Sequence, residues 1–242
     1  MAKKKTSGPI VVNDSTPEQT RLQGTAITGN DLTIESYFPT TIYHIDKSEF
    51  LDVVKEVANE FLDKRKAEAT LNEVYPVYMT ENINYDPRML EFANYIAQTA
   101  WNILDSQGYD VSTTATYFSE FWCQEHHKHS LMEQHAHGYG AQIVGFYFLD
   151  SPAGCSNVVF HDPKPAKVQV NLREKNVSNA TAGSNMINFE AKPGTLMLTN
   201  AWLPHSFSRH HSDEPMRFIH FNVMVKDIRE FGSPNPPAVE VI

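Results

Sequence analysis

Histidine stands out by its distribution in this 242-residue chain, since ten of its eleven histidines lie within residues 126–220. His135 and His137 are two residues apart in a His-Ala-His sequence. Side chains two apart on a β-strand point to the same face, so both imidazoles can reach one metal ion. His205 follows an apolar run at 195–200 and is a third candidate ligand. Imidazole nitrogens are common ligands of iron and zinc, so this spacing predicts a metal site.

An isolated His-x-His pair is weak support for a metal site, because histidines also serve as ordinary surface or core residues. We expect most of the other histidines to be solvated in loops, and two to be structural. The solvated group is His126, His127, His129, His210 and His211, and the structural pair is His161 and His220. The metal hypothesis therefore depends on His135, His137 and His205 acting together.

Arg217 begins the alternating segment 217–225, where it shares a strand face with Ile219, Phe221 and Val223. That face is apolar, so we expect it to point inward. A guanidinium in an apolar interior is expensive unless a carboxylate pairs with it. The carboxylate could belong to the protein or to a ligand, and the guanidinium fork suits bidentate pairing with either.

The elements that position these residues are mostly strands, because apolar and polar residues alternate from about residue 115 onward. Turn residues separate the alternating runs at 152–154 and 193–194. The predicted strands are 116–124, 142–150, 157–161, 167–171, 186–191, 195–200 and 217–225, preceded by an early strand at 37–45.

Two amphipathic helices are predicted in the first half of the chain. The first spans 47–66, with Asp46 as N-cap and Glu49 as its capping-box partner. The second begins at Asp86-Pro87 and ends at Gly108. Helices followed by short strands predict an α+β domain in which the helices pack on an antiparallel sandwich or barrel. We expect a flexible tail at 1–30, one domain at 31–230 and an irregular tail at 231–242.

Composition narrows the classes of function. The formal net charge of −9 argues against broad nucleic-acid binding, which needs a net positive surface. No apolar run is long enough to predict a transmembrane helix, and no signal-peptide pattern follows the basic start. The two cysteines suggest no disulfide framework, so the expected setting is a reducing cytoplasm, or the host cytoplasm if the chain is viral.

The order of the motifs resembles that of the 2-oxoglutarate/Fe(II)-dependent oxygenases, in particular an uncharacterised branch found in bacteria and phages. That branch has an early Phe-Pro-Thr-x-Ile segment, a Trp before the first ligand strand, a His-x-His, a Phe-x-Asp-Pro, a Pro-Gly-Thr-Leu…Trp-Leu-x-His block and a late Arg with Phe-Asn. In this chain the matching positions are 38–42, Trp122, 135–137, 160–163, 193–205, Arg217 and 221–222.

This resemblance implies a prolyl-hydroxylase-like double-stranded β-helix, also called a jelly roll, with the N-terminal helices packed on its sheet. It implies an enzyme that uses Fe(II), 2-oxoglutarate and O2 to hydroxylate a substrate. His135, His137 and His205 would bind the iron. Arg217 would pair with the far carboxylate of the small-molecule cosubstrate, with Tyr147 or Asn222 adding a hydrogen bond.

One position departs from the family pattern, because most such enzymes use two histidines and one carboxylate. His137 stands at the carboxylate position, and Asp162 and Glu133 are alternatives for the third ligand. Two other classes stay open: a cupin-type three-histidine metalloenzyme that does not use 2-oxoglutarate, and a non-catalytic jelly-roll module. The cupin pattern lacks its usual Glu after His-x-His here and leaves Arg217 unexplained.

Overall fold

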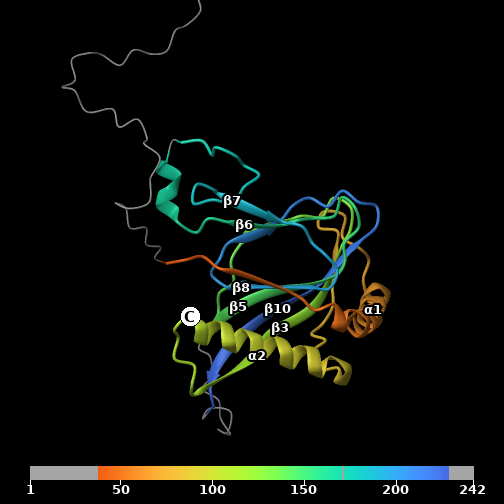
Figure 1. Ribbon diagram of the computed structural model, residues 1–242. Helices are drawn as coiled ribbons and strands as arrows, with labels where there is room; N and C mark the ends of the chain where they lie inside the picture. Colours follow the sequence, from red (N-terminus) through yellow and green to blue (C-terminus); the bar gives the residue numbers. More distant parts are fainter. Residues whose placement is uncertain (1–37, 171, 229–242) are drawn as a thin grey trace, which may run out of the picture. The chain divides into compact units, whose positions relative to one another are not determined.

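The computed structural model describes residues 38–228 except residue 171, so the predicted tails at 1–30 and 231–242 lie outside the described residues. The compact unit that carries the candidate site begins at Thr40. It contains two long helices followed by most of the strands (Figure 1). In the described part of the chain, no helix is long and apolar enough to cross a membrane.

The strands form two antiparallel sheets. The larger has the order β1-β8-β5-β10-β3-β2, and the smaller has the order β4-β9-β6-β7. The larger sheet consists of β1 (Ile42–Asp46), β8 (Thr195–Asn200), β5 (Ala141–Asp150), β10 (Met216–Asp227), β3 (Thr114–His126) and β2 (Val77–Met79). The smaller consists of β4 (Met132–His135), β9 (His205–Phe207), β6 (Val158–His161) and β7 (Met186–Phe189). Two sheets that exchange consecutive strands in this way form a double-stranded β-helix, as the resemblance implied.

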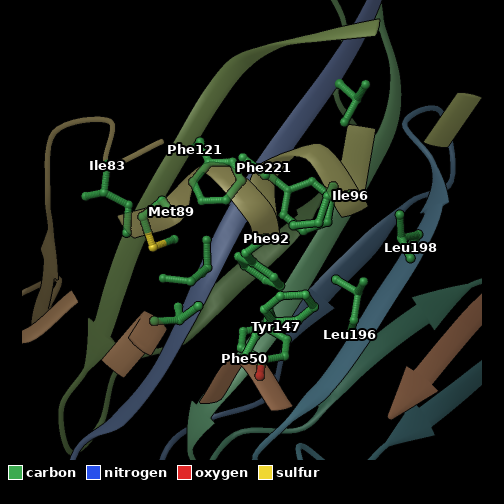
Figure 2. Close-up of a cluster of buried hydrophobic side chains, with 14 of the residues drawn as sticks. Phe50, Ile83, Met89, Phe92, Ile96, Phe121, Tyr147, Leu196, Leu198 and Phe221 are labelled. Carbon is green, nitrogen blue, oxygen red and sulfur yellow. The ribbon is translucent and has the colours of Figure 1, made fainter. Parts of the chain in front are cut away.

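Both long helices cover the same face of the larger sheet (Figure 1). α1 spans Leu51–Glu68 and α2 spans Leu90–Ser106. Their apolar sides, with residues such as Val54 and Phe92, are fully buried against strand residues such as Phe121 and Tyr147 (Figure 2). The predicted packing of two N-terminal helices on the sheet is therefore confirmed.

A second apolar cluster fills the space between the two sheets. The larger sheet contributes residues such as Phe146 and Phe218, and the smaller contributes Phe160 and Phe207. The rings of Phe207 and Phe218 are stacked, with centroids 4.8 Å apart. The larger sheet is thus apolar on both faces, and its strands are not simply apolar on one side and polar on the other.

Several local predictions need correction. The first three residues of the segment predicted as a strand at 167–171 lie in a 3-10 helix, η3 (Pro165–Gln169), which begins at a proline. The first helix begins with a 3-10 turn, η1 (Ser48–Phe50). Asp46 accepts hydrogen bonds from Ser48, and Glu49 pairs with Lys47 instead of forming a capping box.

The second helix is preceded by a 3-10 turn, η2 (Pro87–Met89). The Asp86 carboxylate accepts a hydrogen bond from the Arg88 backbone N–H at 2.9 Å, so the predicted helix start at Asp86-Pro87 is confirmed. Strands β2, β4 and β9 were not predicted. Each has four residues or fewer, which is too short for alternation to be read.

Candidate metal centre

His135 and His205 are brought together by strand pairing. His135 ends β4, His205 begins β9, and the two are partners in the antiparallel register. His137 lies just past the end of β4, where its backbone N–H donates to the Ala201 carbonyl at 2.9 Å. That bond ties the His-Ala-His segment to the turn between β8 and β9, so three imidazoles from two segments face one another.

The three imidazoles converge on one point. The ring centroids of His135 and His205 lie 4.5 Å apart, and that of His137 lies 5.2 Å from each. The Nε2 atoms of His137 and His205 are 3.3 Å apart. One ligand atom from each residue lies within 4.8 Å of the others, which is the spacing that a single ion bound by three nitrogens requires.

Hydrogen bonds fix two of these rings with Nε2 free to bind a metal. His135 Nδ1 lies 2.8 Å from the Glu133 carbonyl oxygen, and His205 Nδ1 lies 3.0 Å from the Leu203 carbonyl oxygen. A carbonyl only accepts, so both Nδ1 atoms carry the proton and donate. The Nε2 lone pairs are then available, which is the usual arrangement behind metal-ligating histidines.

A carboxylate lies behind His137. Its Nδ1 is 2.9 Å from the Asn222 amide nitrogen, which donates to the Glu120 carboxylate at 2.6 Å. The same carboxylate lies 3.2 Å from His220 Nε2. These side chains share the inner face of the larger sheet because Asn222 is the register partner of Glu120, and His220 that of Trp122. Glu120, His137 and His220 also form a second group with metal-ligand spacing.

Burial keeps two of the candidate ligands, His137 and His205, neutral. It lowers the pKa of His205 to about 3 and that of His137 to about 4, and positive charge on neighbouring histidines lowers both pKa values further. A protonated, charged imidazole cannot bind a metal, and at neutral pH both of these imidazoles are neutral. The pKa of Glu120 is lowered chiefly by its hydrogen bond with His220, so this carboxyl is ionised.

The structure does not bring Arg217 to this site. Its Nε donates to the Glu125 carboxylate at 2.6 Å, and one terminal nitrogen lies 3.4 Å from Asp150. Arg217 does share a strand face with Ile219 and Phe221, but that face packs against α1 and α2. The guanidinium therefore lies on the face of the sheet that the helices cover, and its carboxylate partners come from the protein itself.

Tyr147 is turned away from the histidines for the same reason. Its ring packs against Phe92 of α2, with centroids 4.6 Å apart, and its hydroxyl donates to the Lys47 carbonyl at 2.8 Å. Of the three residues expected to bind the cosubstrate, Asn222 alone borders the histidine cluster.

Among the described residues, neither alternative third ligand belongs to a group with metal-ligand spacing. Asp162 forms an ion pair with Lys167 at 2.8 Å, and Glu133 contributes its backbone carbonyl to His135. His126 was expected in a solvated loop but ends β3 and is fully buried, and His210 is buried as well.

Sequence reasoning missed Glu120 and treated His220 as merely structural. A signal was present, since Phe218, His220 and Asn222 alternate along β10 opposite the Arg217 face. Two polar side chains on an otherwise apolar strand face would have marked the metal-facing side.

The fold is that of a double-stranded β-helix protein, and the three convergent histidines form a candidate three-nitrogen metal site. Residues 120–222 match the family described as "Putative 2OG-Fe(II) oxygenase". This segment contains all three histidines together with Glu120 and Asn222. Over this segment, which is less than half of its 242 residues, the chain is similar to the 2OG-Fe(II) oxygenases, a family of enzymes that use Fe(II), 2-oxoglutarate and O2. A comparison with curated proteins gives no match.

Solved structures share the fold at low sequence identity. AviO1 from Streptomyces viridochromogenes Tue57 is 12% identical with a TM-score of 0.54, covering 82% of this chain and 93% of that one. A Pseudomonas putida prolyl-4-hydroxylase is 10% identical with a TM-score of 0.51, covering 76% and 92%. The epimerase SnoN in complex with Fe3+, alpha ketoglutarate and nogalamycin RO is 12% identical with a TM-score of 0.54, covering 78% and 81%.

The three histidines are suited to bind iron, but the arginine expected to bind 2-oxoglutarate is not beside them. Three imidazole nitrogens with open positions suit Fe(II). For the far carboxylate of 2-oxoglutarate, the expected cation Arg217 lies on the other face of the sheet. Among the described residues, no arginine or lysine side chain is buried, and the inner face of β10 offers Met216, Phe218, His220 and Asn222.

Proposed function

We propose that this chain is an Fe(II)- and 2-oxoglutarate-dependent dioxygenase whose iron is held by His135, His137 and His205. The observation that carries this proposal is the convergence of three imidazoles, two of them fixed with Nε2 free. In this class the iron, 2-oxoglutarate and O2 together supply the oxidation that hydroxylates a substrate C–H bond, while 2-oxoglutarate is converted to succinate and CO2.

The residues around the metal centre would have separate tasks. Asn222 and Glu120 position His137 and supply negative charge beside it. The aromatic layer formed by Phe146, Phe160 and Phe207 packs against His205 or its neighbours and would exclude water from the reacting atoms. We also propose a reducing, cytoplasmic setting, which the free thiols of Cys123 and Cys155 support.

A second candidate function is a three-histidine dioxygenase that does not use 2-oxoglutarate. The specific observation in its favour is that no buried arginine or lysine occurs among the described residues. The iron site would be the same in both functions, and the difference would lie in the cosubstrate alone.

The test begins with anaerobic Fe(II) and continues with 2-oxoglutarate. We expect a visible charge-transfer band that needs both additions, and metal analysis should give about one iron per chain. His205→Ala should lose the iron and the band, whereas His211→Ala, a change of an exposed histidine, should keep both. Iron binding without the band on addition of 2-oxoglutarate would favour the second candidate, and unchanged iron content in His205→Ala would contradict the ligand set.

A further inference from the structure

A cavity of about 830 Å³ lies against the segment that joins β6 to β7. A smaller neighbouring cavity shares much of its lining and reaches Phe160 and Leu203. Both residues belong to the metal centre's surroundings, since the Phe160 ring lies 6.2 Å from the His205 ring and the Leu203 carbonyl accepts from His205 Nδ1. The smaller cavity is therefore lined by two residues that adjoin His205, and the larger cavity shares its lining and follows the β6–β7 segment.

The lining of this cavity is positively charged, although the chain as a whole carries a formal charge of −9. Two acidic residues line it, and both are already engaged. Asp162 pairs with Lys167 at 2.8 Å, and the Glu174 carboxylate accepts a hydrogen bond from the Asn185 backbone at 3.2 Å. Against these two carboxylates stand four cationic side chains: Lys164, Lys167, Arg173 and Lys175.

Two of the four cationic side chains have no ion-pair partner among the described residues. Arg173 and Lys175 are exposed, and within the described part of the chain neither forms an ion pair. Lys167, in contrast, binds both Asp162 and the Ser184 carbonyl oxygen. A guanidinium and an ammonium held at one cavity form a site for phosphate or carboxylate, which the guanidinium fork can bind through two hydrogen bonds.

Apolar side chains accompany these cations. Val170, Leu172 and Met186 line the same cavity with exposed fractions of 54%, 85% and 56%. Large apolar side chains that stay exposed around a cavity mark a binding surface more often than a packing fault. Together the lining suits a molecule with an anionic group and an apolar body.

We propose that this cavity is the substrate site and that the substrate is an organic anion, whose phosphate or carboxylate group is bound by Arg173 and Lys175. The proposal rests on the proposed function, because it places the substrate beside the candidate iron. It narrows the substrate to small anionic organic molecules.

Phenyl phosphate is a suitable probe, titrated calorimetrically into the full chain with a chelator present so that no iron takes part. We expect the wild-type protein to bind phenyl phosphate more tightly than inorganic phosphate and to show no binding of phenol. The double variant Arg173→Gln/Lys175→Gln should bind phenyl phosphate at least about tenfold more weakly, because two charge-assisted hydrogen bonds are lost. Lys192→Gln, which changes an exposed lysine in the turn between β7 and β8, should bind like wild type.

Equal affinity in wild type and the double variant, or no binding by wild type, would overturn the proposal. A second arm adds 2-oxoglutarate to the metal-free complex. If 2-oxoglutarate displaces phenyl phosphate at comparable concentration, the cations serve the cosubstrate and the substrate assignment is wrong. Because these titrations contain no iron, a failure of the iron site would leave them unchanged, so the two failures can be told apart.

Discussion

His137 stands where many iron oxygenases carry a carboxylate, and a carboxylate is nevertheless close by. Glu120 reaches His137 through the Asn222 amide, with separations of 2.6 Å and 2.9 Å. A metal ion bound by three neutral imidazoles keeps its full charge, and an ionised group behind one ligand partly offsets it. At the scale of single residues, the negative charge would therefore lie on Glu120, behind the candidate ligand His137, and not on the ligand itself.

Glu120→Gln tests this arrangement. We expect it to weaken iron binding by about 10- to 100-fold, as is typical for outer-shell partners of metal ligands. In a His137→Asp background, where the charge returns to the ligand position, the same change should matter by less than about threefold. Metal titration of the four proteins measures both effects, with Glu190→Gln, an exposed acidic residue, as the control. Equal weakening in both backgrounds would show that Glu120 does not act through His137.

Arg217 belongs to the packing of the helices on the sheet. Its partner Glu125 has a fully buried side chain, which Lys66 and His127 also contact at 2.9 Å and 2.7 Å. Arg217→Ala would leave this buried carboxylate with fewer partners, so the free energy of unfolding should fall by about 2 to 3 kcal/mol. Urea unfolding measures the loss, and Arg217→Lys should recover part of it. If Arg217→Ala kept the stability of the wild type but bound 2-oxoglutarate more weakly, Arg217 would instead be a cosubstrate-binding residue.

At the scale of elements, the close packing of the larger sheet depends on a glycine in β5. This strand lies between β8 and β10, and its Gly145 is the register partner of both Leu198 and Phe221. A Cβ at Gly145 would lie 2.6 Å from the Met197 carbonyl oxygen and would collide with the Phe221 ring. The absence of a side chain at this position allows the ring of Phe221 to fill the space against α2.

Gly145→Ala should therefore lower the free energy of unfolding by about 2 to 3 kcal/mol, as overpacking does in a dense core. Chemical denaturation measures the loss. Gly183→Ala is the matched control, because a Cβ there would meet nothing closer than Thr181 Oγ1 at 3.4 Å, and it should change stability by less than about 0.5 kcal/mol. If Gly145→Ala left the free energy of unfolding unchanged, β5 would be able to shift to accommodate the methyl group.

At the scale of the whole molecule, buried histidines link folding to pH. Burial lowers the pKa of His126 to about 3 in the folded chain, while an unfolded histidine takes up its proton near pH 6.5. The unfolded state therefore binds more protons between these values. Stability from this group is fully present above about pH 6.5 and falls as the pH drops toward 3, by about 1.4 kcal/mol per pH unit.

Urea unfolding of the metal-free protein at pH 7.5 and pH 5 tests this linkage. His126→Gln should lose about 2 kcal/mol less than wild type between the two pH values, since 1.5 units separate pH 5 from the unfolded pKa. An identical loss in both proteins would assign the acid sensitivity to other groups, such as the buried His205 and His220.

The sequence by itself determined the class of fold and the three histidines. Alternation of period two and helical periodicity are local properties, and they located both helices and most long strands. The His-Ala-His spacing is local as well, so the candidate ligands could be named without a structure. Short strands such as β4 and β9, and the 3-10 helix η3, were missed because three to five residues carry too little pattern.

Only the tertiary structure decided which face of each strand lines the site. The alternation along β10 separated Arg217 from His220 and Asn222, but both faces of this sheet are buried, one by helices and the other by the second sheet. Burial alone therefore could not tell the inner face from the outer one. The same uncertainty hid Glu120, which reaches His137 only because β3 and β10 pair in the register observed.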